Sequence, residues 1–274
     1  RLENADAGGM SASPYFEAIA VEAWLGSRPV FQDLTLTLRL GEPTVLLGPN
    51  GAGKSALIHL ISRSLYPVVK PGSALRLFGN STVNLWDLRQ RIGFVSSALQ
   101  ASYIPSVPAE DVVLSGVFGS VGLGRPQQPT GQQRAQALEQ LEQLGLTHLQ
   151  GRPFGECSDG QRRRLLLGRA LIHQPEVLVL DEPINGLDFK AKHELLASLR
   201  QLSQQGTTVL LVTHQLDAVI PEIERAVLIK EGSIVGDGSV ADVLTSDTLS
   251  ACFDTPMAVL EQGGWRQAIP RLEP

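Results

Sequence analysis

A glycine-rich stretch that ends in lysine and serine is the segment of this chain best suited to bind phosphate. Residues 48–55 read GPNGAGKS, which fits the Walker A pattern G-x-x-x-x-G-K-S, and the apolar run 44–47 comes directly before them. Glycines let successive backbone N–H groups turn toward a phosphate, and a helix that begins there adds a favourable dipole. The alternative, a glycine turn without a ligand, fits these flanks less well.

We therefore expect a nucleotide at this loop. The Lys54 ammonium is expected to reach the β- and γ-phosphates and the Ser55 hydroxyl to bind magnesium, as in other loops of this pattern. The loop residues assigned to nucleotide binding are Gly48, Pro49, Asn50, Gly51, Ala52, Gly53, Lys54, Ser55 and Ala56.

Two acidic residues follow a second apolar run. Residues 177–180 read VLVL and lead directly into Asp181 and Glu182. Acids at the carboxyl end of a buried parallel strand face the same crevice as the phosphate loop. Asp181 then suits a magnesium ligand, and Glu182 suits the base that positions and deprotonates an attacking water. The alternative is that both acids are solvated turn residues, which the preceding strand makes the weaker interpretation.

Composition excludes several other classes of protein. The 274 residues are 43% hydrophobic, enough for a sizeable core, and 23 basic against 28 acidic residues give a net charge of −5. Without a broad basic surface, nucleic acid is not the expected partner. Cys157 and Cys252 are far apart and form no C-x-x-C pair, which argues against a zinc site and favours a reducing, cytoplasmic compartment.

The distribution of apolar residues predicts neither a membrane-spanning segment nor a targeting segment. No apolar run approaches the roughly 18 to 20 residues of a membrane span. Residues 1–9 are small and polar and precede Met10, so we interpret them as a remnant of cloning ahead of a natural start. Residues 10–274 are expected to form a single domain.

The apolar patterns predict an α/β fold. Residues 16–21 and 34–40 alternate apolar with polar, which is typical of antiparallel strands, whereas 44–47, 177–180 and 208–212 are nearly all apolar, as in central parallel strands. Helical spacing follows at 53–64 and 190–205, and the segments 226–229 and 233–235 around KEG predict a hairpin.

A helical subdomain is expected at about 86–170, inserted in this core. Glycine, proline and glutamine become frequent there, and 132–144 predicts an amphipathic helix with Leu138, Leu141 and Leu144 on its apolar face. The apolar stretch 112–121 is either part of a partner-docking surface or core packing of the subdomain, and the sequence leaves both open.

The segment CSDGQ at 157–161 resembles the LSGGQ signature of the ATP-binding-cassette (ABC) ATPases. Ser158, Gly160 and Gln161 match that motif, while Cys157 and Asp159 depart from it. An acid so near a triphosphate must point away or bond to a neighbouring N–H group or arginine. The resemblance extends from about residue 16 to about 244, with the motifs in the order that the family requires.

Four further positions are similar to family motifs. Residues 184–188 read INGLD and resemble the D-loop, which implies a nucleotide contact for Asp188. His214, after the strand 208–212, resembles the switch histidine on the γ-phosphate. Gln100 resembles the Q-loop glutamine that touches magnesium and the transport partner. Trp24 resembles the aromatic residue that stacks on adenine, with a packed strand-edge tryptophan as the alternative.

The resemblance implies a fold and a reaction. The fold is a P-loop parallel-sheet core with an antiparallel β region and the inserted helical subdomain, and the reaction is ATP hydrolysis with Mg²⁺ as cofactor. Two cassettes, as a homodimer or with a second cassette chain, are expected to pack head to tail, so that each signature closes over the ATP of the other.

The implied role is the ATPase subunit of a transporter, peripheral at the inner face of a membrane and coupled to separate permease subunits. Cassettes of the metal-uptake and molybdenum-related branches and soluble single-cassette relatives are the branches that the sequence resembles. The alternative function is a soluble ABC ATPase that acts as a nucleotide-driven clamp or regulator without a membrane partner.

Overall fold

The all-apolar runs lie side by side in one sheet, as their composition predicts. The computed structural model describes residues 12–124 and 126–271, so the expected remnant at 1–9 lies outside them. Within these residues the strand order is β5-β6-β7-β3-β8-β9, and every neighbouring pair is parallel except the β8–β9 hairpin. The strands are β3 (Thr44–Leu47), β5 (Ile92–Ser96), β6 (Val177–Asp181), β7 (Thr208–Thr213), β8 (Arg225–Lys230) and β9 (Ser233–Ser239).

Both faces of this sheet are covered, which explains why its central strands are almost wholly apolar. Successive side chains of a strand point to opposite faces. Val45 and Leu47 accordingly pack in one hydrophobic cluster, with the helices beyond β5, whereas Leu46 packs in a second cluster with the N-terminal part of the chain. The sheet is the layer between two cores.

A smaller antiparallel sheet covers one of these faces. Its order is β2-β1-β4, and the strands expected at 16–21 and 34–40 are confirmed as longer antiparallel neighbours. Helix α1 shares the hydrophobic cluster of this sheet through Leu57, Leu60 and Ile61. The elements are β1 (Pro14–Leu25), β2 (Arg28–Arg39), α1 (Lys54–Ile61) and β4 (Ala74–Leu77).

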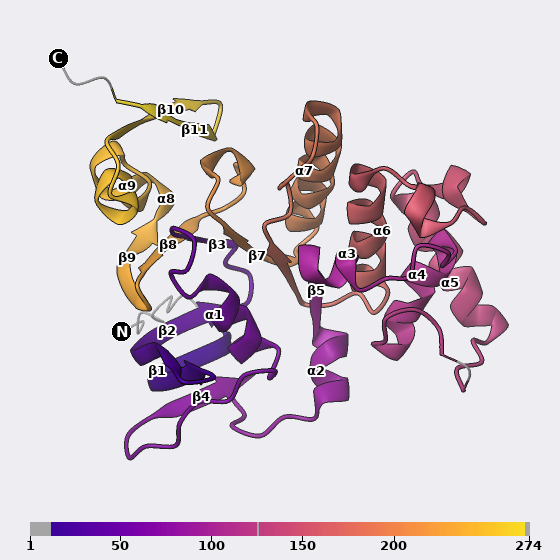
Figure 1. The fold of residues 1–274 in the computed structure, drawn as a ribbon, viewed down its shortest axis with the longest axis horizontal. Helices are drawn as coiled ribbons and strands as arrows, with labels where there is room; N and C mark the ends of the chain where they lie inside the picture. Colours follow the sequence, from indigo (N-terminus) through magenta and orange to yellow (C-terminus); the bar gives the residue numbers. More distant parts are fainter. Residues whose placement is uncertain (1–11, 125, 272–274) are drawn as a thin grey trace, which may run out of the picture.

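The chain between β5 and β6 is helical and lies to one side of the sheets, at the right of Figure 1. Its helices are α3 (Ser97–Ala101), α4 (Ala109–Leu114), α5 (Gly131–Gln143) and α6 (Asp159–Leu171), with short 3₁₀ turns at Ser115–Phe118, Thr147–Leu149 and Phe154–Glu156.

Two details differ from the expected insertion at 86–170, and a third decides between its alternatives. That range includes β5, which pairs with β6 in the parallel sheet, so the helical stretch begins only after Ser96. In α5 the buried side chains are Ala137 and Leu141, while Leu138 is 38% exposed, because the face is rotated by one position. Within 112–121, the residues 112–117 are buried, in agreement with core packing.

Helix α7 and the C-terminal elements complete the described chain. Leu195, Leu196 and Leu199 of α7 are buried against the sheet, as their spacing predicts. A two-stranded hairpin that the sequence did not indicate, β10–β11, ends the described chain. The elements are α2 (Leu85–Arg91), α7 (Phe189–Gln204), a 3₁₀ turn at Leu216–Ala218, α8 (Val240–Val243), α9 (Ser246–Phe253), β10 (Met257–Gln262) and β11 (Trp265–Pro270).

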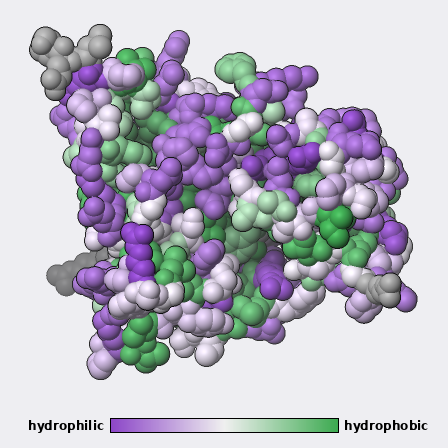
Figure 2. All heavy atoms as spheres, in the orientation of Figure 1, coloured by the Kyte–Doolittle hydropathy of each residue, from purple (hydrophilic) through white to green (hydrophobic). Residues whose placement is uncertain are grey.

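The helices of the described residues do not reach the length and hydropathy that a membrane span requires. Over 12–124 and 126–271, each helix is too short or too polar to cross a bilayer. Figure 2 shows hydrophilic residues over most of this face, with hydrophobic ones in the hollow between the sheets and the helical stretch.

The turn between β8 and β9 packs against β2, and this contact generates a stability prediction. A Cβ at Gly232 would lie 1.9 Å from the Val30 carbonyl oxygen, at a φ of +75°. Gly263, in the β10–β11 turn, also has a positive φ but has nothing within 4 Å of its Cβ position. We expect Gly232→Ala to lower the free energy of unfolding by about 2–4 kcal/mol and Gly263→Ala by about 1–2 kcal/mol. Urea unfolding measures both, and equal losses would show that the β8–β9 turn does not pack on β2.

Candidate nucleotide site

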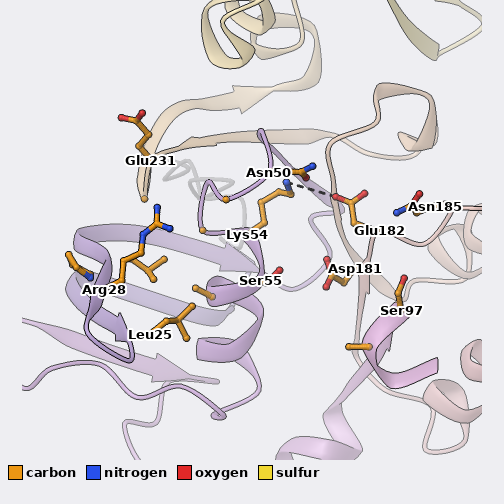
Figure 3. A pocket seen from close by; sticks show the side chains of 17 residues that line it. Leu25, Arg28, Asn50, Lys54, Ser55, Ser97, Asp181, Glu182, Asn185 and Glu231 are labelled. Carbon is orange, nitrogen blue, oxygen red and sulfur yellow. Dashed lines mark ion pairs between the residues drawn. The ribbon is translucent and has the colours of Figure 1, made fainter. Parts of the chain in front are cut away.

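A pocket of about 670 Å³ opens where β3, β6 and the tips of two β-turns meet (Figure 3). The parallel register places Leu47 beside Thr213, and Asp181 beside Val212, so the segments that follow these strands emerge at one edge of the sheet. The pocket is lined by Leu25, Arg28, Pro29, Val30, Asn50, Gly51, Gly53, Lys54, Ser55, Ala56, Ser97, Ala98, Asp181, Glu182, Asn185, Glu231 and Gly232.

The phosphate loop is held close to β8. A Cβ at Gly48 would lie 2.1 Å from the Ile229 carbonyl oxygen, and Gly53 adopts a φ of +111° just before α1 begins. Lys54 is buried, and its ammonium donates to the carbonyl oxygens of Gly48 (2.7 Å) and Pro49 (3.0 Å). Burial lowers the pKa of Lys54, and the nearby carboxylates of Glu182 and Asp181 oppose that effect. The loop thus points a fixed cation into the pocket.

Glu182 is the most constrained side chain of the site. Its backbone has a φ of +47°, and its N–H donates to the Val212 carbonyl oxygen at 2.8 Å. Its carboxylate accepts from the Thr213 hydroxyl at 3.0 Å, contacts Nδ1 of His214 at 2.8 Å and lies 3.9 Å from Nζ of Lys54. A left-handed backbone costs free energy in a non-glycine residue, so these contacts hold the carboxylate in one place. The structure thus brings together Glu182, the expected base, and His214, the expected switch histidine, which were predicted separately.

Asp181 lies beside Glu182 at the end of β6. Burial raises its pKa, and the adjacent Glu182 charge raises it further, while Lys54 acts in the opposite direction. Asp181 and Ser55 both line the pocket. The Ser55 hydroxyl and the Asp181 carboxylate are oxygen donors of the kind that a hard divalent cation prefers, and a cation there would offset the burial of the Asp181 charge.

Gln100 does not line the pocket, although the sequence suggested that it would. Ser96 is in register with Asp181, so the next residue, Ser97, faces the site, while Gln100 lies one turn further along α3. The Gln100 side-chain amide instead donates to Asp159 at 3.4 Å. Ser97 was identifiable from the sequence as the first residue after the apolar strand β5, in the same way that Asp181 and Glu182 follow the apolar run of β6.

Trp24 also lies outside the pocket lining, where its neighbour Leu25 is found. Adjacent residues of a strand face opposite sides, so a shift of one position in the expected register moves the side chain to the other face. The Trp24 indole N–H donates to Glu22 at 2.6 Å, which corresponds to the strand-edge alternative. Arg28 and Glu231, which the sequence did not single out, line the same end of the pocket as Leu25.

Comparisons with known proteins agree with this geometry. Residues 31–185 match the family model described as ABC transporter. The chain is 36% identical over 246 residues to an uncharacterised ABC transporter ATP-binding protein, YlmA of Bacillus subtilis, which covers 89% of this chain and 90% of that protein. The chain belongs to the ABC transporter ATP-binding family.

Other relatives of this ABC cassette carry more specific names. It is 34% identical over 251 residues to the cobalt import ATP-binding protein CbiO of Rhodobacter capsulatus, across 90% of this chain and 82% of that one. A solved putative metal-chelate type ABC transporter in an inward-facing conformation aligns with a TM-score of 0.78 and 26% identity, over 95% of this chain and 98% of that chain. The fold is the ABC ATPase fold, and the cassette is an ATPase.

The signature of the cassette begins a helix and lies outside the pocket. Ser158 caps α6, where its hydroxyl accepts from the Gln161 N–H (3.3 Å) and the Gln161 side chain accepts from the Ser158 N–H (2.9 Å). The two residues therefore form a capping box. Gly160 allows α6 to approach α7, because a Cβ there would lie 2.4 Å from Cβ of Ala191. Asp188 caps α7 by accepting from the Ala191 N–H at 2.8 Å.

Asp159, the acidic departure from the signature, has a cationic partner. Its carboxylate accepts from the Arg162 guanidinium at 3.3 Å and from Gln100. The next residue, Arg163, is buried and donates to the Ser97 hydroxyl at 3.1 Å. The sequence required such an acid to be bonded to an arginine or turned away, and the first arrangement is the one found. The bonds from Gln100 to Asp159 and from Arg163 to Ser97 connect α3, on the pocket wall, to α6.

The hydrogen bond from Thr213 to Glu182 generates a kinetic prediction. Thr213→Val keeps the shape of a buried side chain but removes the hydroxyl that orients the carboxylate. We expect kcat to fall about 5- to 10-fold, as for the loss of one hydrogen bond worth about 1 kcal/mol, with ATP affinity unchanged.

Thr208→Val, at the other end of β7, is the matched control. Thr208 is also buried and accepts from the Gly41 N–H at 2.8 Å, away from the pocket. It is expected to lose stability and keep its kcat. Steady-state ATPase assays measure the difference, and an unchanged kcat in Thr213→Val would contradict the orienting role.

Proposed function

We propose that this cassette is the ATPase subunit of a transporter, in which Mg²⁺-ATP drives head-to-tail pairing of two cassettes and moves a separate permease. The observation that carries the proposal is a single pocket that contains Lys54, Asp181 and Glu182, with the Glu182 carboxylate held by Thr213 and His214. That combination serves both to bind a triphosphate and to cleave it.

In this proposal the loop holds the phosphates. Backbone N–H groups of 48–55 and the N-terminus of α1 surround them, and the Lys54 ammonium exchanges its bonds to the Gly48 and Pro49 carbonyls for phosphate oxygens. Ser55 and Asp181 would hold Mg²⁺, which supplies charge neutralisation on the phosphates. Gln100, expected to share this role, is bonded to Asp159 instead.

Glu182 and His214 carry the proposed hydrolysis. The Glu182 carboxylate lies in the pocket and would accept the proton of the attacking water, which is positioned by the same group. His214 Nδ1 lies 2.8 Å from that carboxylate and donates its N–H to it, and the imidazole would contact the terminal phosphate when the nucleotide is bound. Thr213 keeps the carboxylate directed at the water during that exchange.

The position of the signature supports a second cassette. Ser158, Gly160, Gln161 and Asp188 are absent from the described lining of the pocket of their own chain. In a head-to-tail pair they would complete the site of the partner, whose phosphates the N-terminus of α6 would face. The contact between Asp159 and Arg162 reduces the negative charge that a partner's ATP would meet there.

The permease is proposed to dock in a second cavity, of about 300 Å³. It shares Ser55, Ala98 and Asp181 with the nucleotide pocket, so α3 forms a wall common to both. A permease segment in this groove would therefore contact the wall of the nucleotide pocket. The complex would lie at the cytoplasmic face of a membrane. The relatives are named for cobalt, manganese and phosphonates, so the proposal names no cargo.

A soluble, clamp-like ABC ATPase is the second candidate function. It would use the same pocket and the same pairing of cassettes, but it would leave the groove beside α3 without a membrane partner. Purification from membranes in complex with a permease supports the transporter, and purification with a soluble complex alone supports the clamp.

Lys54→Ala tests the phosphate site. Removal of charge-assisted contacts worth about 1.5–3 kcal/mol each is expected to lower ATP affinity by about 100-fold or more. Lys192→Ala removes a lysine that is ion-paired with Asp217 instead and is expected to bind ATP as the wild type does. Calorimetric titration measures both, and unchanged affinity in a folded Lys54→Ala protein would refute the phosphate site.

Glu182→Gln tests hydrolysis and pairing together. The amide keeps the size of the side chain but cannot accept the proton, so ATP should still bind while hydrolysis falls about 10²- to 10⁴-fold. The ATP-bound state should accumulate, and light scattering should detect a dimer with ATP and magnesium, whereas the wild type returns to monomer during turnover.

Ser158→Arg in the Glu182→Gln background should abolish that dimer, because a bulky cation would occupy the place of the partner's phosphate. Thr130→Arg is the matched control, since Thr130 caps α5 with a capping box of the same kind. The control should lose similar helix stability and remain a dimer. A Glu182→Gln protein that binds ATP, stays monomeric and hydrolyses at the wild-type rate would overturn both the catalytic role and the pairing.

A further inference from the structure

At the end of the pocket remote from the catalytic acids, none of the described lining residues has an aromatic side chain. Asp181 and Glu182 lie at one end in Figure 3, Lys54 lies between, and Leu25 and Arg28 lie at the other. A nucleotide with its terminal phosphate near Glu182 must direct its base toward Leu25 and Arg28. None of the seventeen described residues that line the pocket is Trp, Tyr, Phe or His.

Arg28 is available to contact a base. Its side chain is exposed and has no hydrogen bond or ion pair within residues 12–124 and 126–271. A guanidinium group is planar, is weakly hydrated and stacks on the faces of ring systems. Leu25 and Val30, which line the same end, supply an aliphatic surface for the rest of the ring.

Glu231 lies at the same end of the pocket, at the tip of the β8–β9 turn and above Arg28 in Figure 3. The turn is attached to the phosphate loop, because the Gly232 N–H donates to the Ala52 carbonyl oxygen at 2.8 Å. The neighbouring cation, Lys230, is engaged by Asp254 at 2.6 Å, whereas no described residue bonds to the Glu231 carboxylate. Carboxylates are suitable acceptors for ribose hydroxyl groups.

We propose that this cassette holds the nucleoside of its substrate without an aromatic stack: the Arg28 guanidinium lies on the face of the base, Leu25 and Val30 pack beside it, and Glu231 accepts hydrogen bonds from the ribose hydroxyls. This inference rests on the proposed binding of nucleoside triphosphate. A guanidinium on the ring face contacts every purine alike and does not read its edge. The cassette therefore accepts GTP with an affinity within about 3-fold of that for ATP, since stacking tolerates any base.

The test compares ligands that do and do not carry a base. Calorimetric titrations of the full chain, with magnesium chelated to prevent turnover, use ATP, GTP and inorganic tripolyphosphate. Arg28→Ala is expected to weaken ATP and GTP about 5- to 100-fold, the range for loss of one stacking partner, and to leave tripolyphosphate unchanged. Arg28→Tyr should restore ATP binding, because a ring offers a similar flat surface.

Trp24→Ala is the matched control, since Trp24 is exposed in the same β1–β2 hairpin as Arg28 but lies outside the pocket. It is expected to bind all three ligands as the wild type does. Lys54→Ala, in contrast, should weaken tripolyphosphate as well as the nucleotides. Failure of the phosphate site and failure of the base site are therefore distinguishable.

The ribose contact has its own comparison. Wild type is expected to bind 2′-deoxy-ATP about 10- to 100-fold more weakly than ATP, as for the loss of one hydrogen bond to a charged group. Glu231→Ala should bind the two equally. Glu231→Gln should retain part of the difference, because an amide oxygen still accepts.

Three results would overturn the proposal: an Arg28→Ala protein with wild-type affinity for ATP, a Trp24→Ala protein with reduced affinity, or discrimination of ATP from GTP beyond 100-fold. Equal binding of ATP and 2′-deoxy-ATP by wild type would remove the role of Glu231.

Discussion

The parallel register of three buried strands is the constraint on which the site depends. β3, β6 and β7 are neighbours in the order β6-β7-β3, and each ends at the same edge of the sheet. The phosphate loop, the two acids and the Thr213-His214 pair follow these three ends. Because both faces of the sheet are covered by hydrophobic clusters, a shift of any one strand would expose apolar side chains and separate the groups at its end.

Close backbone approaches fix the loop on that edge. Gly48 and Gly232 lie against carbonyl oxygens of β8 and β2 at distances that a Cβ would not allow. The phosphate loop and the β8–β9 turn are thereby joined into one rim, through the bond from Gly232 to Ala52. Through this rim, residues of the antiparallel β region, the phosphate loop and the β8–β9 turn line one pocket, although the first and the last are about 200 positions apart in the sequence.

Helix α3 connects the nucleotide pocket to the rest of the molecule. Ser97 on the pocket wall accepts from Arg163, and Gln100 donates to Asp159, so both bonds end on the first turns of the signature helix α6. Ala98, between them, also lines the neighbouring groove. The five-residue helix α3 therefore has direct contacts with the nucleotide pocket, with the neighbouring groove and with α6.

Sequence alone determined the features that depend on local chemistry. The glycines, Lys54 and Ser55 of the loop and the acids after an apolar run were identifiable, because they are recognised from residue type and immediate neighbours. Ser158 and Asp188 were predicted as nucleotide contacts, and the structure adds that they are the N-caps of α6 and α7. The α/β class followed from apolar periodicity in the same way.

Only the tertiary structure decided which side chains enter the pocket. Leu25 and not Trp24, and Ser97 and not Gln100, line it, because one position along a strand or one turn of a helix changes the face on which a side chain lies. Sequence patterns locate an element to within a few residues, which is too coarse for that choice. Glu231 and Arg28 line one pocket because the β8–β9 turn packs on β2, a contact between segments about 200 residues apart that leaves no local signal.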